Sequence, residues 1–293
     1  MLDSAPPDSY KHILIRRSGA LGDVILTTPI VRRFLRENSL CKIEFITAHT
    51  SVFEGIPAVH ASGDASVAQH FVQSVDLDLA YERDPARHIV DAFMLVAFGD
   101  EGVPEDKQQI LFRQDVAADT FGVTSGIVFV HAARSWISRT LPLRTWSRAC
   151  LDLARRGFTP IAIGTAKDML PQWCQDYRDR FTLGQLATLF DRAAGNGGCF
   201  LGMDSALLHV AGATHIPIAG VFTSVLPQYR LPYRNGMLGR GCVAIQPALP
   251  CLGCQARGPT PRTTELCSRQ DYACVSMVEA DQLADAVLRL TAK

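Results

Sequence analysis

The chain has 293 residues, of which 47% are hydrophobic, and its 29 lysines and arginines balance its 29 aspartates and glutamates. This length suits two domains, and the neutral charge gives no support for general binding to nucleic acid or to a membrane surface. No run of about 18 apolar residues indicates a membrane span, and the polar start MLDSAPPDSYKH lacks the layout of a secretory signal. We therefore expect a cytoplasmic protein.

The first part of the chain predicts alternating strands and helices. Residues 12–16 form a short apolar run, which is followed by SGALGD, a helical pattern over Val24–Glu37 and a second strand over 42–47. Strand, glycine loop, helix and strand in this order are typical of a βαβ unit. Farther along, 75–80 suggests a strand and 88–99 a helix.

The second part restarts this alternation. Strands are expected at 126–132, 159–164, 197–202 and 216–222, and helices at 145–156, from about Lys167, at 183–193 and at 279–290. Such alternation implies parallel sheets with both faces covered. The two runs meet near residues 119–126, so we expect two α/β domains, 1–122 and 123–293, that face a cleft.

The segment from Cys199 to Thr223 predicts a buried strand, a turn, a helix of small residues and a second buried strand. Asp204 and Ser205 stand where this helix begins, and His209 follows one turn later. A helix N-terminus offers free N–H groups and positive potential to phosphate, and open α/β folds bind ligands at the carboxyl ends of their strands. The segment therefore predicts a phosphate-binding mouth, with a purely structural His209 as the alternative.

A glycine-containing loop follows the first strand. Within it, Gly19 and Gly22 permit a tight turn and close approach of the backbone, beside Ser18. The loop has neither the glycine spacing of a dinucleotide-binding motif nor the lysine of a P-loop. Asp23, which closes the motif, either stabilises the dipole of the next helix or faces the cleft as a general base.

Nine cysteines in a chain of this kind suggest metal binding or buried thiols more than disulfides. Cys251 and Cys254 have the spacing of a metal knuckle, and Cys267 and Cys274 complete four thiols that could hold structural iron or zinc. Cys242, at the start of this cysteine-rich segment 242–274, is a fifth candidate, and disulfides or free thiols are the alternatives. The remaining cysteines stand in apolar contexts and are expected to be buried thiols: Cys41, Cys150, Cys174 and Cys199.

Three segments resemble the heptosyltransferases of glycosyltransferase family 9, in that family's order. RRSGALGDVILTTPIVRRFLRE is similar to the N-terminal signature, HAARSWISRTLPLRTW to the segment with a Lys-Arg-Trp-Pro element, and MDSALLHVAGATHIPIAGVFTS to the donor-site signature. The resemblance spans about residues 12–275. It implies a GT-B fold, in which two Rossmann-like domains with parallel sheets face a central cleft. It also implies inverting sugar transfer, usually of heptose from ADP-heptose, without a metal at the reaction centre.

This resemblance also implies roles for individual residues. Asp23 matches the family's catalytic base, and Arg139 stands where the family usually has a lysine that binds donor phosphate. The donor-binding positions are matched by Asp204, Ser205, His209 and Ala206, the last of which replaces a usual glycine.

Two further residues match the donor side more loosely. Lys167 lies in the region that contacts the nucleoside in the family. Thr223 either contacts phosphate or simply forms the polar end of a strand.

The C-terminal cysteines resemble those of bacterial autotransporter heptosyltransferases, which bind iron and modify protein hydroxyls. The resemblance therefore implies a structural metal and an acceptor on a protein, with the lipopolysaccharide core as the competing acceptor. A binding or assembly protein that retains the fold without catalysis is one alternative function, and a transferase for another nucleotide sugar is a second. No nucleic-acid partner is expected, and a homo-oligomer is left open.

Overall fold

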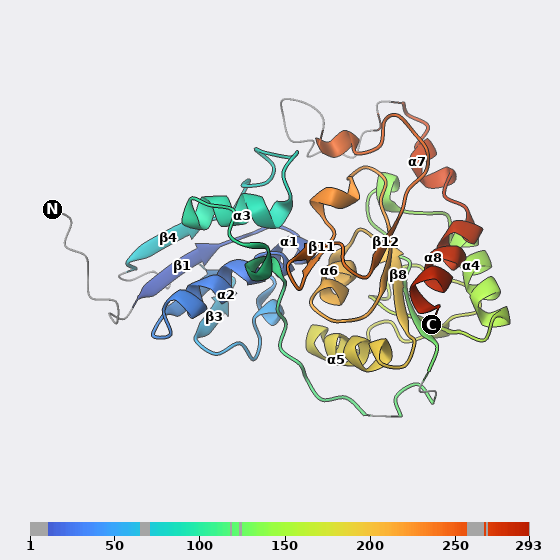
Figure 1. Ribbon diagram of the computed structural model, residues 1–293, viewed down its shortest axis with the longest axis horizontal. Coiled ribbons are helices and arrows are strands. Elements are labelled where there is room, and N and C mark those ends of the chain that lie inside the picture. The colour runs from blue at the N-terminus through green and yellow to red at the C-terminus, as the bar shows by residue number, and fades with distance from the viewer. Residues whose placement is uncertain are drawn as a thin grey trace.

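The computed structural model describes residues 11–64, 71–117, 119–122, 125–256, 267 and 269–292. Two parallel sheets run through the described chain, and helices pack against both of them (Figure 1). The smaller sheet belongs to the N-terminal part and the larger one to the C-terminal part. The predicted α/β class with two parallel sheets is therefore confirmed.

The smaller sheet has the strand order β3-β2-β1-β4, and all its neighbouring strands are parallel. The strands are β1 (His12–Arg16), β2 (Lys42–Ile46), β3 (Val59–Ser62) and β4 (Gln73–Asp76). Ile13 and Ile15 alternate with more exposed residues in β1 and are buried in the core, as expected for a strand. Two helices flank this sheet, α2 (Thr28–Glu37) and α3 (Ile89–Phe98) (Figure 1).

The helix predicted over Val24–Glu37 is in fact two helices. α1 (Leu21–Ile25) ends before α2 begins. Pro29 stands in the first turn of α2, where a missing N–H is tolerated, whereas inside a longer helix it would remove a hydrogen bond. The Thr27 hydroxyl donates to the carbonyl oxygen of Val24 at 2.7 Å and helps to end α1. The predicted continuous helix was wrong for this reason.

The strand predicted over 75–80 is displaced toward the N-terminus. β4 ends at Asp76, and residues 78–80 form a turn in which the Ala80 N–H donates to the carbonyl oxygen of Leu77 at 3.3 Å. A residue bonded within such a turn cannot pair with a neighbouring strand, which ends the sheet here.

The larger sheet has six parallel strands in the order β12-β9-β8-β5-β6-β7. They are β5 (Ile127–His131), β6 (Thr159–Ala162), β7 (Gln175–Asp176), β8 (Cys199–Met203), β9 (Ile218–Val221) and β12 (Cys242–Ile245). The chain builds outward from β5 to β7 and then returns to β8 on the other side of β5. The strand order therefore reverses between β5 and β8, and such a switch point is where open sheets bind ligands.

Helices cover both faces of the larger sheet (Figure 1). One side has α4 (Leu143–Arg155) and α8 (Ala280–Thr291), and the other has α5 (Leu183–Ala194) and α6 (Ala206–Gly212). Adjacent residues of β5 pack on opposite faces of the larger sheet. Val128 belongs to the apolar cluster of α4 and α8, whereas the ring of Phe129 lies 4.9 Å from that of Phe190 in α5.

One apolar cluster also joins the two sheets. It contains Ile15 of β1, Ile25 of α1, Leu208 of α6 and Phe200 of β8, all of them buried. α1 packs directly on α6 in the middle of the molecule (Figure 1). The first helix of the N-terminal part is thus in contact with the helix that follows the predicted phosphate-binding turn.

No helix follows β6, although one was predicted from about Lys167. Residues 165–174 form turns that lead to β7. The Asp168 carboxylate accepts hydrogen bonds from the N–H and the hydroxyl of Thr165, at 2.8 and 3.0 Å, and these close a tight turn. Pro171 then disfavours a helical residue before it. The predicted helix was wrong because this local turn replaces it.

A small antiparallel hairpin, β10 (Tyr233–Arg234) and β11 (Met237–Leu238), was not predicted. It reaches α3: the Tyr233 hydroxyl donates to Asp91 at 3.2 Å. The other short elements are η1 (Thr50–Val52), η3 (Pro104–Lys107), η4 (Ile137–Arg139), η5 (Pro227–Tyr229), η6 (Cys254–Ala256) and α7 (Ala273–Ser276). Within the described ranges, no helix is long and apolar enough to cross a membrane.

Candidate active site

A cavity of about 800 Å³ lies between the two sheets. Its walls include the segments that follow β1, β5, β6 and β8, so the carboxyl ends of strands from both sheets face it. The residues that line it include Gly22, Asp23, Arg139, Asp204, Ser205, Ala206 and His209. Seven of the residues singled out from the sequence are therefore brought together.

Gly22 allows the two halves of the cavity to approach closely. A Cβ atom at this position would lie 3.1 Å from Cδ2 of His209 and 3.3 Å from Cα of Ala206. Both distances are tighter than ordinary van der Waals contact. The absence of a side chain at Gly22 is thus what lets α1 rest on α6.

Ser18 and Gly19 lie behind the cavity and are not among its described lining residues. The N–H and hydroxyl of Ser18 donate to the Asp78 carboxylate at 2.7 and 2.8 Å, which fixes the loop after β1. A Cβ atom on Gly19 would lie 2.7 Å from the Arg17 guanidinium and 2.8 Å from Asp23 Oδ2. Gly19 therefore leaves the room that Arg17 and Asp23 occupy.

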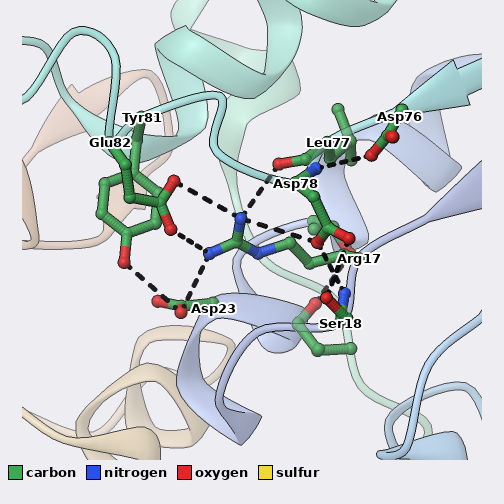
Figure 2. A network of polar contacts seen from close by, with 10 residues as sticks. Arg17, Ser18, Asp23, Asp76, Leu77, Asp78, Tyr81 and Glu82 are labelled. Atoms are coloured by element: carbon green, nitrogen blue, oxygen red, sulfur yellow. Dashed lines mark hydrogen bonds and ion pairs between the residues drawn. The ribbon is translucent and has the colours of Figure 1, made fainter. Parts of the chain in front are cut away.

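Asp23 is held by a buried arginine that the sequence did not single out (Figure 2). Nη2 of Arg17 donates to Asp23 Oδ2 at 3.1 Å and to Glu82 at 2.9 Å, and Nη1 donates to the carbonyl oxygen of Leu77 at 3.0 Å. The Arg17 side chain is 2% exposed, whereas that of Asp23 is 20% exposed and lines the cavity. Asp23 is thus a fixed carboxylate that remains accessible from the cavity.

The Tyr81 hydroxyl also donates to Asp23, at 3.4 Å. Burial, together with the negative charge of Asp23, raises the pKa of Tyr81 well above its usual value. The phenol therefore stays protonated and acts as a hydrogen-bond donor to this carboxylate.

The opposite wall combines Arg139, Asp204 and His209. Nη1 of Arg139 lies 3.6 Å from Asp204 Oδ2, and Nε2 of His209 lies 3.7 Å from Asp204 Oδ1. Burial lowers the pKa of His209 to about 4, so its imidazole is neutral at pH 7. Within the described part of the chain, Arg139 Nε, Asp204 Oδ2 and His209 Nδ1 are buried without a hydrogen-bond partner. Buried polar atoms are normally paired, so these three point to a polar ligand.

Sequence reasoning missed a second histidine of the cavity, His131 at the end of β5. Its Nδ1 lies 2.9 Å from the Ser205 hydroxyl, and its Nε2 lies 3.4 Å from Asp168 Oδ2. The sequence feature that could have identified His131 is a polar residue at the end of a fully buried strand, next to the point where the strand order reverses. The pairing of His131 with Gly202, just before the turn of Ser205, could be known only from the sheet.

Asp168 is ionised in this arrangement. Burial alone would raise its pKa, but hydrogen bonds from His131 and from the N–H groups of Thr165 and Arg134 lower the pKa well below its usual range. Asp168 can therefore only accept hydrogen bonds.

Thr223 and Lys167 lie outside the described cavity lining. Thr223 is 2% exposed, and its hydroxyl donates to the carbonyl oxygen of Ser138. Lys167 belongs to the turn between Thr165 and Asp168, both of which do line the cavity.

The described cysteines form no disulfide, and the described residues contain no group of three or more His, Cys, Asp or Glu side chains arranged to hold a metal. Burial, together with the charges of Cys254, Cys267 and Cys251, raises the pKa of Cys274 to about 11. Of the four cysteines expected to be buried, Cys41, Cys150 and Cys199 are buried and Cys174 is partly so. The Sγ atoms of Cys150 and Cys174 lie 3.4 Å apart.

No family model and no curated protein sequence matches the chain. Solved structures do match. A glycosyl transferase family 9 structure from Veillonella parvula has a TM-score of 0.72 at 15% identity, with 99% of each chain covered. The iron-containing dodecameric glycosyltransferase TibC from enterotoxigenic E. coli has a TM-score of 0.75 at 15% identity, with 97% of this chain and 76% of that one covered.

TibC has also been solved as a heptosyltransferase in complex with ADP-D-beta-D-heptose. The E. coli heptosyltransferase WaaC, solved with ADP, has a TM-score of 0.61 at 12% identity, with 96% of this chain and all of that one covered. At such identities the likeness concerns the course of the backbone. The chain therefore has the GT-B fold of these glycosyltransferase family 9 and heptosyltransferase structures.

Proposed function

We propose that the protein is an inverting glycosyltransferase that transfers a sugar from a nucleotide diphosphate, with ADP-heptose as the donor. The observation that carries this proposal is that one cavity brings an accessible carboxylate, Asp23, together with Arg139, Asp204 and His209, which include buried polar atoms without a hydrogen-bond partner among the described residues. The shared fold with structures named as heptosyltransferases supports the choice of donor.

Asp23 is the general base in this proposal. It takes the proton of the acceptor hydroxyl while the hydroxyl oxygen forms a bond to the anomeric carbon. The bond from that carbon to the phosphate oxygen breaks on the opposite face, and the nucleoside diphosphate leaves with the electron pair. Arg17 and Tyr81 hold the carboxylate in place through their hydrogen bonds.

The donor side neutralises the charge of the leaving diphosphate. Arg139 and the backbone N–H groups at the start of α6, from Ala206 onward, supply positive potential without a metal at the reaction centre. The planar guanidinium of Arg139 suits two phosphate oxygens, and its Nη groups exchange their contacts with Gln255 and Asp204, at 2.6 and 3.6 Å, for the phosphate. Asp204 repels phosphate, so we assign its carboxylate to sugar hydroxyls, beside the neutral His209.

Further assignments follow from position in the fold. We place the acceptor on the side of residues 1–122 and the donor on the side of residues 123–293, with Lys167 near the nucleoside. Thr223 supports this wall through Ser138. A protein hydroxyl and a lipopolysaccharide core sugar remain the two candidate acceptors, and we place the reaction in the cytoplasm, with a homo-oligomer in keeping with the dodecameric TibC.

We further propose a structural iron or zinc at Cys251, Cys254, Cys267 and Cys274. Four thiolates suit either metal, and the contribution of the other three thiols to the raised pKa of Cys274 supports this grouping. Because the described positions form no completed site, metal binding has to draw the thiols together. Elemental analysis and melting before and after chelation test this, with Cys251→Ser losing the metal and Cys41→Ser keeping it.

The central test compares wild type with Asp23→Asn, using ADP-heptose and calorimetric binding of ADP. We expect the variant to bind ADP as wild type does and to transfer sugar about 10²–10⁴-fold more slowly. Asp100→Asn is the matched control, because Asp100 is a half-exposed carboxylate paired with Arg33, away from the cavity. Transfer by Asp23→Asn at the wild-type rate would refute the proposed base. A melting temperature that neither ADP, UDP nor GDP changes would refute the donor site.

A further inference from the structure

His131, Ser205 and Asp168 form a chain of polar contacts along the wall of the cavity. Ser205 stands immediately before α6, where a serine usually caps the helix, yet its side chain makes no capping hydrogen bond. Its hydroxyl instead lies 2.9 Å from Nδ1 of His131. Gly164 leaves room for the next contact, since a Cβ atom there would lie 2.6 Å from Asp168 Oδ2 and 2.9 Å from Cδ2 of His131.

The ionised Asp168 fixes where the hydrogens of His131 are. A carboxylate only accepts, so the imidazole nitrogen that faces it, Nε2, carries a hydrogen. In the neutral imidazole, Nδ1 then has no hydrogen and accepts from the Ser205 hydroxyl. In this state Ser205 presents only oxygen lone pairs to the cavity, which repel a phosphate oxygen.

Protonation of His131 reverses the direction of the second hydrogen bond. Both ring nitrogens then donate, Nε2 to Asp168 and Nδ1 to the oxygen of Ser205. The hydrogen of the Ser205 hydroxyl becomes free to turn into the cavity and to donate to an anion. A diphosphate next to Ser205 favours this state, because it adds negative charge beside the imidazolium.

We propose that His131, held by Asp168, takes up one proton from solvent when a nucleoside diphosphate occupies the cavity, and that Ser205 then donates a hydrogen bond to a diphosphate oxygen. This inference rests on the proposed function, since it assumes a diphosphate at this wall. The proton on His131 is separate from the proton of the acceptor hydroxyl, which goes to Asp23. His131 thus acts on the leaving group through Ser205 and is a positioning residue.

Other charged groups also line the cavity. From the larger sheet's side these are Arg134, Arg139, Asp179, Arg180, Asp204 and His209. Asp23 and Arg230 face it from α1 and from the segment after η5. Because several of them could also exchange protons on binding, the test compares proton uptake between variants instead of relying on its total.

The experiment is calorimetric titration of the full chain with ADP at several pH values, in two buffers with different ionisation enthalpies. The difference in heat gives the number of protons taken up per ADP. His131→Asn is the main variant, because its amide can still contact Ser205 but cannot take up a proton. His215→Asn is the matched control, because His215 is 77% exposed and faces Asp191 outside the cavity.

We expect His131→Asn to take up close to one proton fewer than wild type near pH 7 and to bind ADP about tenfold more weakly, the usual loss for one charge-assisted hydrogen bond. His215→Asn should behave as wild type. Asp168→Asn, in which the imidazolium loses its partner, should move the uptake to lower pH and provides a second test should His131→Asn fail to fold. Equal proton uptake by His131→Asn and wild type, with ADP still bound, would overturn this inference alone. Failure of wild type to bind ADP would overturn both it and the proposed donor site.

Discussion

Replacement of the buried Arg17 by methionine should destabilise the protein strongly. Methionine keeps the apolar stem of the side chain but not the guanidinium carbon, which lies 5.1 Å from the centre of the Tyr81 ring and 5.4 Å from that of Phe93. It removes the guanidinium that lies 3.1 Å from Asp23 and 2.9 Å from Glu82. Loss of one partner from such a buried ionic group costs about 3–5 kcal/mol, because the carboxylates left behind are unpaired. At about 2 °C per kcal/mol for a chain of this size, the melting temperature should fall by about 6–10 °C.

Arg16→Met is the matched control for this change. Arg16 is the neighbouring residue, its side chain is 56% exposed, and its ion pair with Asp78 lies at the surface. An exposed pair contributes about 0–1 kcal/mol, so this variant should melt within about 2 °C of wild type. The double variant with Glu82→Gln removes one unpaired charge and should recover part of the loss caused by Arg17→Met. Equal melting of Arg17→Met and Arg16→Met would refute the reasoning.

Two further predictions concern the close approach of α1 to α6 and the burial of His88. Gly22→Ala should push α1 away from Ala206 and slow transfer about tenfold or more while the fold survives. Gly63→Ala is the control, because a Cβ atom there meets nothing within 4 Å, and it should leave transfer and circular dichroism unchanged. Normal transfer by Gly22→Ala would contradict the close approach. Burial lowers the pKa of His88 to about 4, below the value of about 6.5 expected when unfolded, so stability should fall as pH decreases from about 6.5 to 4, where the unfolded chain binds more protons. Urea denaturation across this range should show a shallower fall for His88→Asn, and an identical slope would contradict it.

Much of the sheet architecture could be predicted because buried parallel strands leave continuous apolar runs. The runs at 126–132 and 197–202 correspond to β5 and β8, and the polar residues after β8 do reach the cavity. The two wrongly predicted helices were caused by single residues that break or replace a helix. The break at Pro29 and the turn closed by Asp168 depend on single residues whose effect competes with an amphipathic pattern.

The contacts that hold Asp23 and Ser205 in place could not be predicted, because they join segments that are distant in the sequence. Arg16 and Arg17 are adjacent and chemically identical, yet one is exposed and the other is buried beside Asp23. Arg17 continues the buried alternation of Ile13 and Ile15, but its place beside Asp23 depends on the packing of residues 77–82 over the loop. His131 meets Ser205 for a similar reason, since β5 and β8 are neighbours in the sheet but 74 positions separate the two residues.

The apolar cluster that joins β1, α1, α6 and β8 has a consequence for how the molecule folds. Ile25 and Leu208 belong to the same cluster although they come from different halves of the chain. Unfolding of one half alone would expose apolar surface of the other half to water. This exposure costs about 25 cal/mol of free energy per Å². The halves should therefore melt in one cooperative transition, and neither half of the cavity should persist as an independent folding unit.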